Sequence, residues 1–363
     1  MSAASDGLDG VIAAETVLSH VDGERGRLIL RGHDIEELAG RTSQEALAAL
    51  LWDGLADDGG DAAAIAPALG EARLAAFDLS RLLLPAARGL SAVEGLRLLL
   101  AALPDASDLP HHVLATAAMP VFVAALARDA QGLAPVPPEP ALSQAADFLR
   151  MLRGAPAEAA HVAALEAYLV TVADHGLNAS TFTTRVVAST RTGVFSSVVA
   201  ALCALKGPLH GGAPGPVLDM LDAIGSEARI EPWLEQAIAG GERLMGFGHR
   251  VYRVRDPRAD VLKAVALTLR GGANRIRFAE AVEAGALRVL ARLKPGRRLD
   301  TNVEFYTALV LEALELPREL FTPVFAIGRV VGWTAHILEQ TRSGRIIRPQ
   351  SAYVGPLPRR PPE

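Results

Sequence analysis

The 363-residue sequence is poor in cysteine, lysine and aromatic residues. Its single cysteine, Cys203, excludes a disulfide within the chain, and this fits a reducing, cytoplasmic environment. We expect Cys203 to be a small core residue, because it lies in the apolar run 198–205. No zinc-ligand spacing, Walker-type loop or dinucleotide fingerprint occurs, so the sequence predicts no metal and no bound nucleotide cofactor of those classes.

Excess positive charge and long apolar runs are also missing. The net charge is −5, and the only lysines are Lys206, Lys263 and Lys294. A general nucleic-acid or membrane-surface binder needs a basic footprint, so both classes are disfavoured. The longest apolar stretch, residues 113–127, contains Pro120 and falls short of the ~20 residues that span a membrane. It predicts a buried helix, and the N-terminal residues lack the pattern of a signal peptide.

The remaining pattern is that of a helical globular protein. Half of the residues are hydrophobic, and the length allows a large core and two domains. Residues 22–24 and 27–32 predict a small N-terminal β-hairpin, which we expect to be the only strand pairing. The fold class is therefore all-α. Helices are predicted after residue 43, at 61–87, 91–103, 110–129, 141–153, 159–173, 196–206, 277–293 and 302–315, from 217, and from the starts at Asp256-Pro257 and Thr322-Pro323.

Two turns each place one histidine among glycines. Residues 207–212 read Gly-Pro-Leu-His-Gly-Gly and contain His210, while residues 245–258 contain His249 followed by several arginines. Glycine lets a ligand approach the backbone closely, and an imidazole titrates near neutral pH. Either histidine alone could be structural. Together with the arginines they indicate a site for an anionic substrate.

These two turns, with residues 174–181, 302–306 and 345–349, resemble the signature segments of the citrate synthase family in order and spacing. The likeness extends from residues 10–16 to residues 353–356. It implies a two-domain helical fold, with a large domain over 1–212 and 323–363 and a small domain over 213–322. It also implies a homodimer that acts on small-molecule substrates.

The resemblance assigns roles residue by residue. His210, His249 and Glu304 would be catalytic, with Glu304 as the base and His210 as hydrogen-bond donor to the acyl group. The oxo acid would be held by His175, Asn178, Arg258, Arg329 and Arg348, the last reaching across from the other subunit. Coenzyme A would contact Arg253 and the turn Leu244, Met245, Gly246, Phe247 and Gly248. For Arg253, a solvated surface arginine is the alternative. No metal and no cofactor beyond the coenzyme A thioester is implied.

The implied activity is that of the tricarboxylic acid cycle enzyme that condenses acetyl-CoA with oxaloacetate and hydrolyses the product to citrate. The alternatives are a 2-methylcitrate synthase that uses propionyl-CoA and a catalytically weak CoA-binding paralogue. Three positions depart from the family pattern. Glu304 stands where Asp is usual, Pro214 stands where Asn is usual, and residues 91–93 read Ser-Ala-Val in place of His-Pro-Met.

Overall fold

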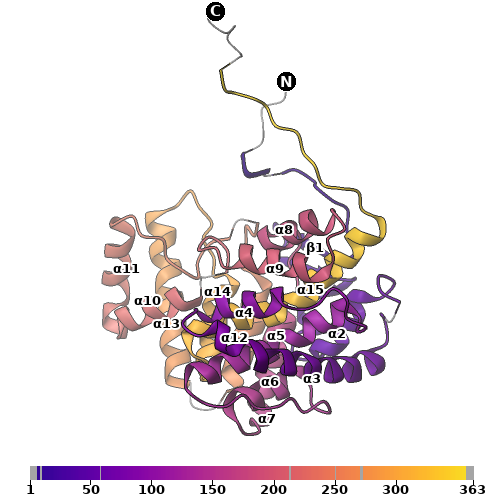
Figure 1. The fold of residues 1–363 in the computed structure, drawn as a ribbon. Helices are drawn as coiled ribbons and strands as arrows, with labels where there is room; N and C mark the ends of the chain where they lie inside the picture. Colours follow the sequence, from indigo (N-terminus) through magenta and orange to yellow (C-terminus); the bar gives the residue numbers. More distant parts are fainter. Residues whose placement is uncertain are drawn as a thin grey trace, which may run out of the picture.

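The computed structural model describes residues 6–8, 10–57, 59–211, 214–249, 251–269 and 273–356, and helices dominate it (Figure 1). Most of the predicted helices are confirmed within a few residues. The described helices are α1 (Ile35–Leu38), α2 (Gln44–Trp52), α3 (Ala62–Ala87), α4 (Ala92–Ala101), α5 (His111–Ala130), α6 (Gln144–Arg153), α7 (Ala159–Thr171), α8 (Ala179–Ala188), α9 (Val194–Leu205), α10 (Pro214–Ile224), α11 (Ile230–Ala239), α12 (Pro257–Thr268), α13 (Ala273–Leu293), α14 (Val303–Ala313) and α15 (Phe321–Ser343). The all-α class is thus confirmed.

The predicted hairpin is present and carries a third strand. β1 (Ser19–Asp22) pairs antiparallel with β2 (Arg27–Leu30), which pairs antiparallel with β3 (His33–Asp34). An isolated bridge also joins Phe247 and Thr301. The expectation that the hairpin is the only strand pairing was therefore wrong, because a two-residue strand and a single bridge leave no alternating pattern in the sequence.

Two long apolar helices form the centre of the core. In the described part of the chain, α5 and the segment Arg318–Ser343, which contains α15, are apolar and long enough to cross a membrane. Their apolar windows are 83% and 94% buried against the rest of the chain, so both are core helices. Pro120 lies inside α5 and is buried there, and the prediction of a buried helix over 113–127 is confirmed.

Three features differ from the predictions. The sequence reading placed no helix at α8, where Thr181, Thr183 and Thr184 weaken helix propensity, and none at α11. Cys203, expected in the core, is exposed. It lies seven residues, or about two helical turns, after exposed Ser196, so both occupy the outer face of α9.

Helices α10 to α14 pack mainly on one another, α11 against α13 and α14 against both α10 and α12. Figure 1 shows α10, α11 and α13 grouped at one side of the molecule. Helices α12 and α14 also contact α7 and so join this group to the remaining helices. The division into domains at 1–212 with 323–363 and at 213–322 stays a prediction, and residues 212 and 213 lie outside the described residues.

Candidate active site

The turn before His249 is built from two glycines and is tied to the start of α14. Gly246 and Gly248 have φ angles of 86° and 80°, which favour glycine. The Gly246 carbonyl accepts a hydrogen bond from the Asn302 N–H at 2.9 Å, and the Asn302 side-chain amide donates to the Gly248 carbonyl at 2.8 Å. A Cβ at Gly246 would lie 2.9 Å from the Phe305 ring. This packing fixes the turn against the helix that carries Glu304.

The same turn sets the tautomer of His249. Its Nδ1 accepts hydrogen bonds from the N–H groups of Val251 and Tyr252, at 3.0 and 3.1 Å. A neutral imidazole that accepts at Nδ1 carries its proton on Nε2. Burial, helped by the positive charge of Arg258, lowers the His249 pKa to about 4. The ring is therefore a neutral hydrogen-bond donor at physiological pH.

His175 lies next to His249. The centroids of the two rings are 5.4 Å apart, and His175 Nε2 lies 3.2 Å from the Tyr252 hydroxyl. Burial, then the charge of Arg258, holds the His175 pKa well below its usual value. Two neutral imidazoles and a phenol thus meet at one point. Tyr252 was not predicted as a site residue, because no local pattern shows which side chain it meets.

Two buried arginines lie beside these histidines. Arg258 is 3% exposed and forms a bidentate ion pair with Asp256, at 3.0 and 2.8 Å. Arg329 is 2% exposed, its guanidinium carbon lies 4.7 Å from the centre of the Phe325 ring, and its Nε donates to the Val172 carbonyl. Burial lowers the Arg329 pKa to about 10.

Arg329 forms no ion pair with any carboxylate in the described ranges. A buried guanidinium without a carboxylate partner is costly unless an anion binds it. Its charge acts on the pKa values of His175, His210 and Glu304, so it lies close to all three. The arrangement predicted for an anionic substrate is present at this point.

Asp256 connects Arg258 to Glu304. It caps α12 through the Arg258 N–H, as the Asp256-Pro257 pair predicts. Its Oδ2 also accepts a hydrogen bond from the N–H of Val303, the first residue of α14. One carboxylate therefore holds both the arginine and the helix N-terminus that precedes Glu304.

Glu304 lies in the first turn of α14. Asn302 caps this helix by accepting from the Glu304 N–H at 3.0 Å. The Glu304 Oε2 atom is buried and has no hydrogen-bond partner among the described residues. Burial raises the Glu304 pKa to about 7, although Arg258 acts in the opposite direction. A buried carboxyl with a free oxygen and a pKa near 7 is suited to proton transfer.

His210 is anchored to the start of α8. Its Nε2 accepts from the Ser180 N–H at 3.2 Å and lies 2.8 Å from the Ser180 hydroxyl. Trp333 donates to the same hydroxyl from α15 at 3.2 Å. The remaining proton of a neutral His210 is then on Nδ1. Burial lowers the His210 pKa to about 4, so this ring too is a neutral donor.

The other predicted substrate-binding residues of the main body differ in their surroundings. Asn178 is the N-cap of α8, where its Oδ1 accepts from the Thr181 N–H and the Ser180 hydroxyl. Leu244 and Phe247 are buried. Arg253 is exposed and makes no side-chain hydrogen bond or ion pair with the described residues.

Arg348 is not brought to the other site residues within one chain. It is exposed and lies on the segment that follows α15. This segment extends away from the helical body, next to the N-terminal segment (Figure 1). Its side chain makes no hydrogen bond or ion pair with the described residues of its own chain.

Asp174, the residue before His175, belongs to a buried polar network. Asp174 Oδ1 lies 3.2 Å from His336 Nε2, and His336 Nδ1 lies 3.0 Å from Arg185 Nη1. Arg185 pairs in turn with Glu339. His336 and Trp333 are fully buried. Within the described ranges, no group of three or more His, Cys, Asp or Glu side chains could hold a metal ion.

The comparisons agree with this geometry. The family model described as "Citrate synthase, C-terminal domain" matches residues 7–350. A "Putative citrate synthase 2" of Mycobacterium tuberculosis is 39% identical over 98% of this chain and 94% of its own length. The citrate synthase of Haloferax volcanii is 38% identical, with 96% and 95% covered.

A solved structure is similar over nearly its whole length. The citrate synthase of Thermoplasma acidophilum, solved as a ternary complex with carboxymethyl coenzyme A and oxaloacetate, has a TM-score of 0.86 at 28% identity. The alignment covers 98% of this chain and 97% of that one. The sequence, the fold and the cluster of histidines and arginines thus agree, and the chain belongs to the citrate synthase family, whose members are acyltransferases.

Proposed function

We propose that this site condenses acetyl-CoA with oxaloacetate and hydrolyses the citryl thioester to citrate and coenzyme A. The observation that carries the proposal is the meeting of neutral His175 and His249 with buried Arg258 and Arg329 beside the unpartnered Glu304 carboxyl. The arginines attract a dicarboxylate, the imidazoles donate hydrogen bonds, and the carboxyl accepts a proton.

Carbanion formation is the first chemical step. The ionised Glu304 carboxylate removes a proton from the acetyl methyl group, and His210 Nδ1–H donates to the thioester oxygen as negative charge develops there. The His210 pKa of about 4 keeps the ring neutral at physiological pH, so it stabilises the developing charge by a hydrogen bond and not by transfer of an imidazolium proton. Such preorganised donors contribute ~3–4 kcal/mol to a transition state.

Carbon–carbon bond formation follows at the ketone of oxaloacetate. His249 Nε2–H donates to the ketone oxygen as it gains charge, while Arg258, Arg329 and His175 hold the two carboxylates. That oxygen takes up one proton to become the hydroxyl group of the product, which balances the proton that Glu304 removed from the acetyl group. Arginine suits this task because its planar fork binds a carboxylate through two hydrogen bonds. Water then attacks the thioester carbonyl, the carbon–sulfur bond breaks, and coenzyme A leaves as the thiol.

We further propose the remaining substrate contacts, one of which comes from a partner subunit. Arg348 binds the oxo acid in the partner site of a homodimer, since its segment leaves the body with exposed Ile346, Tyr353 and Val354. Asn178 borders the oxo acid. Coenzyme A lies along the turn of residues 244–248, with Arg253 near a phosphate, because that arginine is exposed and unpaired in the described chain. The proposed location is cytoplasmic.

A thiol-release assay with acetyl-CoA, oxaloacetate and a thiol reagent tests the activity. Thiol release that depends on oxaloacetate is expected, and none with pure, folded protein would contradict the proposal. Propionyl-CoA is the comparison substrate, because one methylene is worth only ~1–3 kcal/mol in an apolar pocket. The relatives' names favour the citrate over the 2-methylcitrate alternative, so acetyl-CoA should give the higher kcat/KM.

A further inference from the structure

Glu283 on α13 is a buried carboxylate outside the proposed catalytic set. Only 5% of the residue is exposed, and its helix carries none of the proposed catalytic or substrate-binding side chains. Burial alone would raise the pKa of this carboxyl group, but hydrogen bonds from Tyr306, Thr301 and Arg255 hold it below its usual value. The group is therefore ionised at physiological pH. A buried charge of this kind is stable only where donors surround it.

Both oxygens of this carboxylate are bound by the protein itself. Oε1 accepts hydrogen bonds from the Thr301 hydroxyl and from Arg255 Nη1, each at 2.7 Å. Oε2 accepts from the Tyr306 hydroxyl at 2.6 Å and lies 3.4 Å from Lys263 Nζ. Because each oxygen already has protein donors, Glu283 binds other parts of the chain and not a ligand.

The bond to Thr301 acts on the turn that carries His249. Thr301 forms the isolated bridge with Phe247 in that turn. The next residue, Asn302, binds the same turn through its side chain and caps α14 at Glu304. A shift of Thr301 would therefore move the turn and the start of the helix together.

The bond to Tyr306 holds α14 from the side opposite Glu304. Tyr306 follows Glu304 by two residues and is fully buried. Two residues along an α-helix differ in direction by about 200°, so the two side chains point to opposite sides of α14. The hydrogen bond to Glu283 therefore fixes the rotation of α14 about its axis, and with it the position of the Glu304 carboxyl group.

The bond to Arg255 acts on a substrate-binding arginine. Arg255 precedes Asp256, which caps α12 and forms the ion pair with Arg258. Lys263, on the same helix, also contacts Glu283. One carboxylate on α13 thus holds the start of α12, the segment before α14, and α14 itself.

We propose that Glu283 is a positioning residue for the condensation reaction, which fixes His249, Glu304 and Arg258 relative to one another. The inference rests on the proposed function, since it concerns the geometry of that reaction. A displacement of about 1 Å caused by a change far from the chemistry can lower the rate by ~10²-fold. Residues that support a site from behind keep its geometry within such limits.

Steady-state kinetics with acetyl-CoA and oxaloacetate separate these bonds. Tyr306→Phe removes only the donor on α14, so kcat should fall about tenfold or more while the KM for oxaloacetate changes less than about threefold. Glu283→Ala removes every bond, so kcat should fall further and that KM should rise, because Arg258 is no longer held. Glu283→Gln keeps the size and one acceptor oxygen, and its kcat should lie above that of Glu283→Ala.

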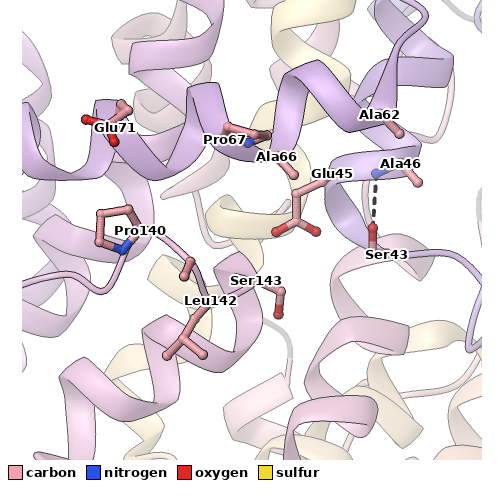
Figure 2. A pocket seen from close by; sticks show the side chains of 11 residues that line it. Ser43, Glu45, Ala46, Ala62, Ala66, Pro67, Glu71, Pro140, Leu142 and Ser143 are labelled. Carbon is pink, nitrogen blue, oxygen red and sulfur yellow. Dashed lines mark hydrogen bonds between the residues drawn. The ribbon is translucent and has the colours of Figure 1, made fainter.

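Asp147 on α6 offers the matched control, because it is a buried carboxylate that also binds an arginine. It lies 2.9 Å from Arg73, which donates to the Leu142 carbonyl in the wall of an open hollow between α2, α3 and the segment before α6 (Figure 2). None of the proposed catalytic or substrate-binding residues lines this hollow. Asp147→Ala should lower Tm and leave kcat of the folded protein unchanged.

Amide hydrogen exchange gives a readout that does not depend on turnover. The N–H groups of Gly248, Asn302 and Glu304 are hydrogen-bonded within the segments that Glu283 holds. Local opening of these segments should make the three amides exchange about tenfold faster or more in Glu283→Ala. Asp147→Ala should leave their exchange at the wild-type rate.

The outcomes distinguish this proposal from the proposed function. Wild-type kcat in both Tyr306→Phe and Glu283→Ala, or unchanged exchange of the three amides in Glu283→Ala, would overturn it. So would a loss of kcat in Asp147→Ala equal to that in Glu283→Ala. If Glu283→Ala does not fold, kinetics and exchange of Tyr306→Phe and Glu283→Gln give the same test. If the wild-type chain releases no thiol but the amides exchange faster, the proposed function fails and the positioning role remains.

Discussion

Glu304 is the proposed catalytic base, and its burial disfavours the ionised form of its carboxyl group. Replacing it with Gln keeps size and hydrogen bonding but removes the ability to accept a proton, so kcat should fall by ~10²–10⁴. Oxaloacetate affinity should change little, because that ligand is held by the histidines and arginines. Steady-state kinetics and calorimetry measure the two quantities.

The companion change is Glu304→Asp. The backbone around Glu304 is fixed by Asn302 and Asp256, so a side chain that is one methylene shorter would leave its carboxyl about 1.5 Å from the working position, and misplacement on this scale is costly in a preorganised site. The Asp variant should therefore be slower than the wild type. Normal turnover in the Gln variant would show that another group takes the proton.

The same residue should make stability depend on pH. Its pKa is raised from 4.5 to about 7 in the folded chain, so the folded state binds the proton more tightly than the unfolded state. Its contribution is then fully present below pH 4.5 and is lost as the pH rises to about 7. Glu304→Gln should raise Tm relative to wild type by about 2 °C or more at pH 8, and less at pH 5. Thermal unfolding at both pH values checks this, and an equal shift at the two would contradict it.

At the scale of elements, Asn302 links two parts of the site. Its side chain caps α14 and donates to the Gly248 carbonyl in the turn before His249. Asn302→Ala should cost about 1 kcal/mol of stability through the lost cap. It should also lower kcat at least about tenfold, because the positions of His249 and Glu304 relative to each other are no longer fixed. Chemical denaturation and kinetics give both values.

Asp61 offers the matched control. It caps α3 by accepting from the Ala63 N–H and lies on the surface, outside the site. Asp61→Ala should lose a similar free energy of unfolding with unchanged kcat. If both variants lost activity in proportion to stability, the link through Asn302 would have no catalytic meaning.

The sequence predicts the positions of helices better than it predicts which residues they contact. Apolar periodicity located α3, α5 and α15, since their buried faces repeat regularly. It missed α8 and placed Cys203 in the core, because propensity and local apolarity do not report which face packs. Ordered motifs gave the histidines and Glu304. They could not give Tyr252 or Ser180, whose contacts span 77 and 30 residues of sequence.

At the scale of the whole molecule, the segment carrying Arg348 extends away from its own chain. If it completes the partner site, Arg348→Ala should weaken oxaloacetate binding without unfolding the chain. Mixing inactive Arg348→Ala and inactive His210→Ala proteins should recover activity, because a hybrid dimer then holds one intact site. No recovery from hybrids verified by native mass spectrometry would place the arginine in its own subunit's site.

Substrate order should follow from where the ligands of the oxo acid originate. His249, Tyr252 and Arg258 belong to the predicted small domain, whereas His175 and Arg329 belong to the predicted large domain. The contact between His175 and Tyr252 already joins the two. An oxo acid bound by both sets should draw them together, exclude water and complete the acyl-CoA site. Oxaloacetate should therefore tighten acetyl-CoA binding by about tenfold or more, in the range typical of coupled sites.

The Glu304→Gln variant allows this coupling to be measured, because acetyl-CoA and oxaloacetate can both be present while turnover is slow. Calorimetry should give a lower Kd for acetyl-CoA when oxaloacetate saturates the protein. Thermodynamic linkage then requires acetyl-CoA to tighten oxaloacetate binding by the same factor. Tyr252→Phe, which removes the hydroxyl at His175, should reduce both factors together. If the Kd of acetyl-CoA is the same with and without oxaloacetate, domain closure cannot be the cause of ordered substrate binding. Both substrates would then bind to a site that is complete before either one binds.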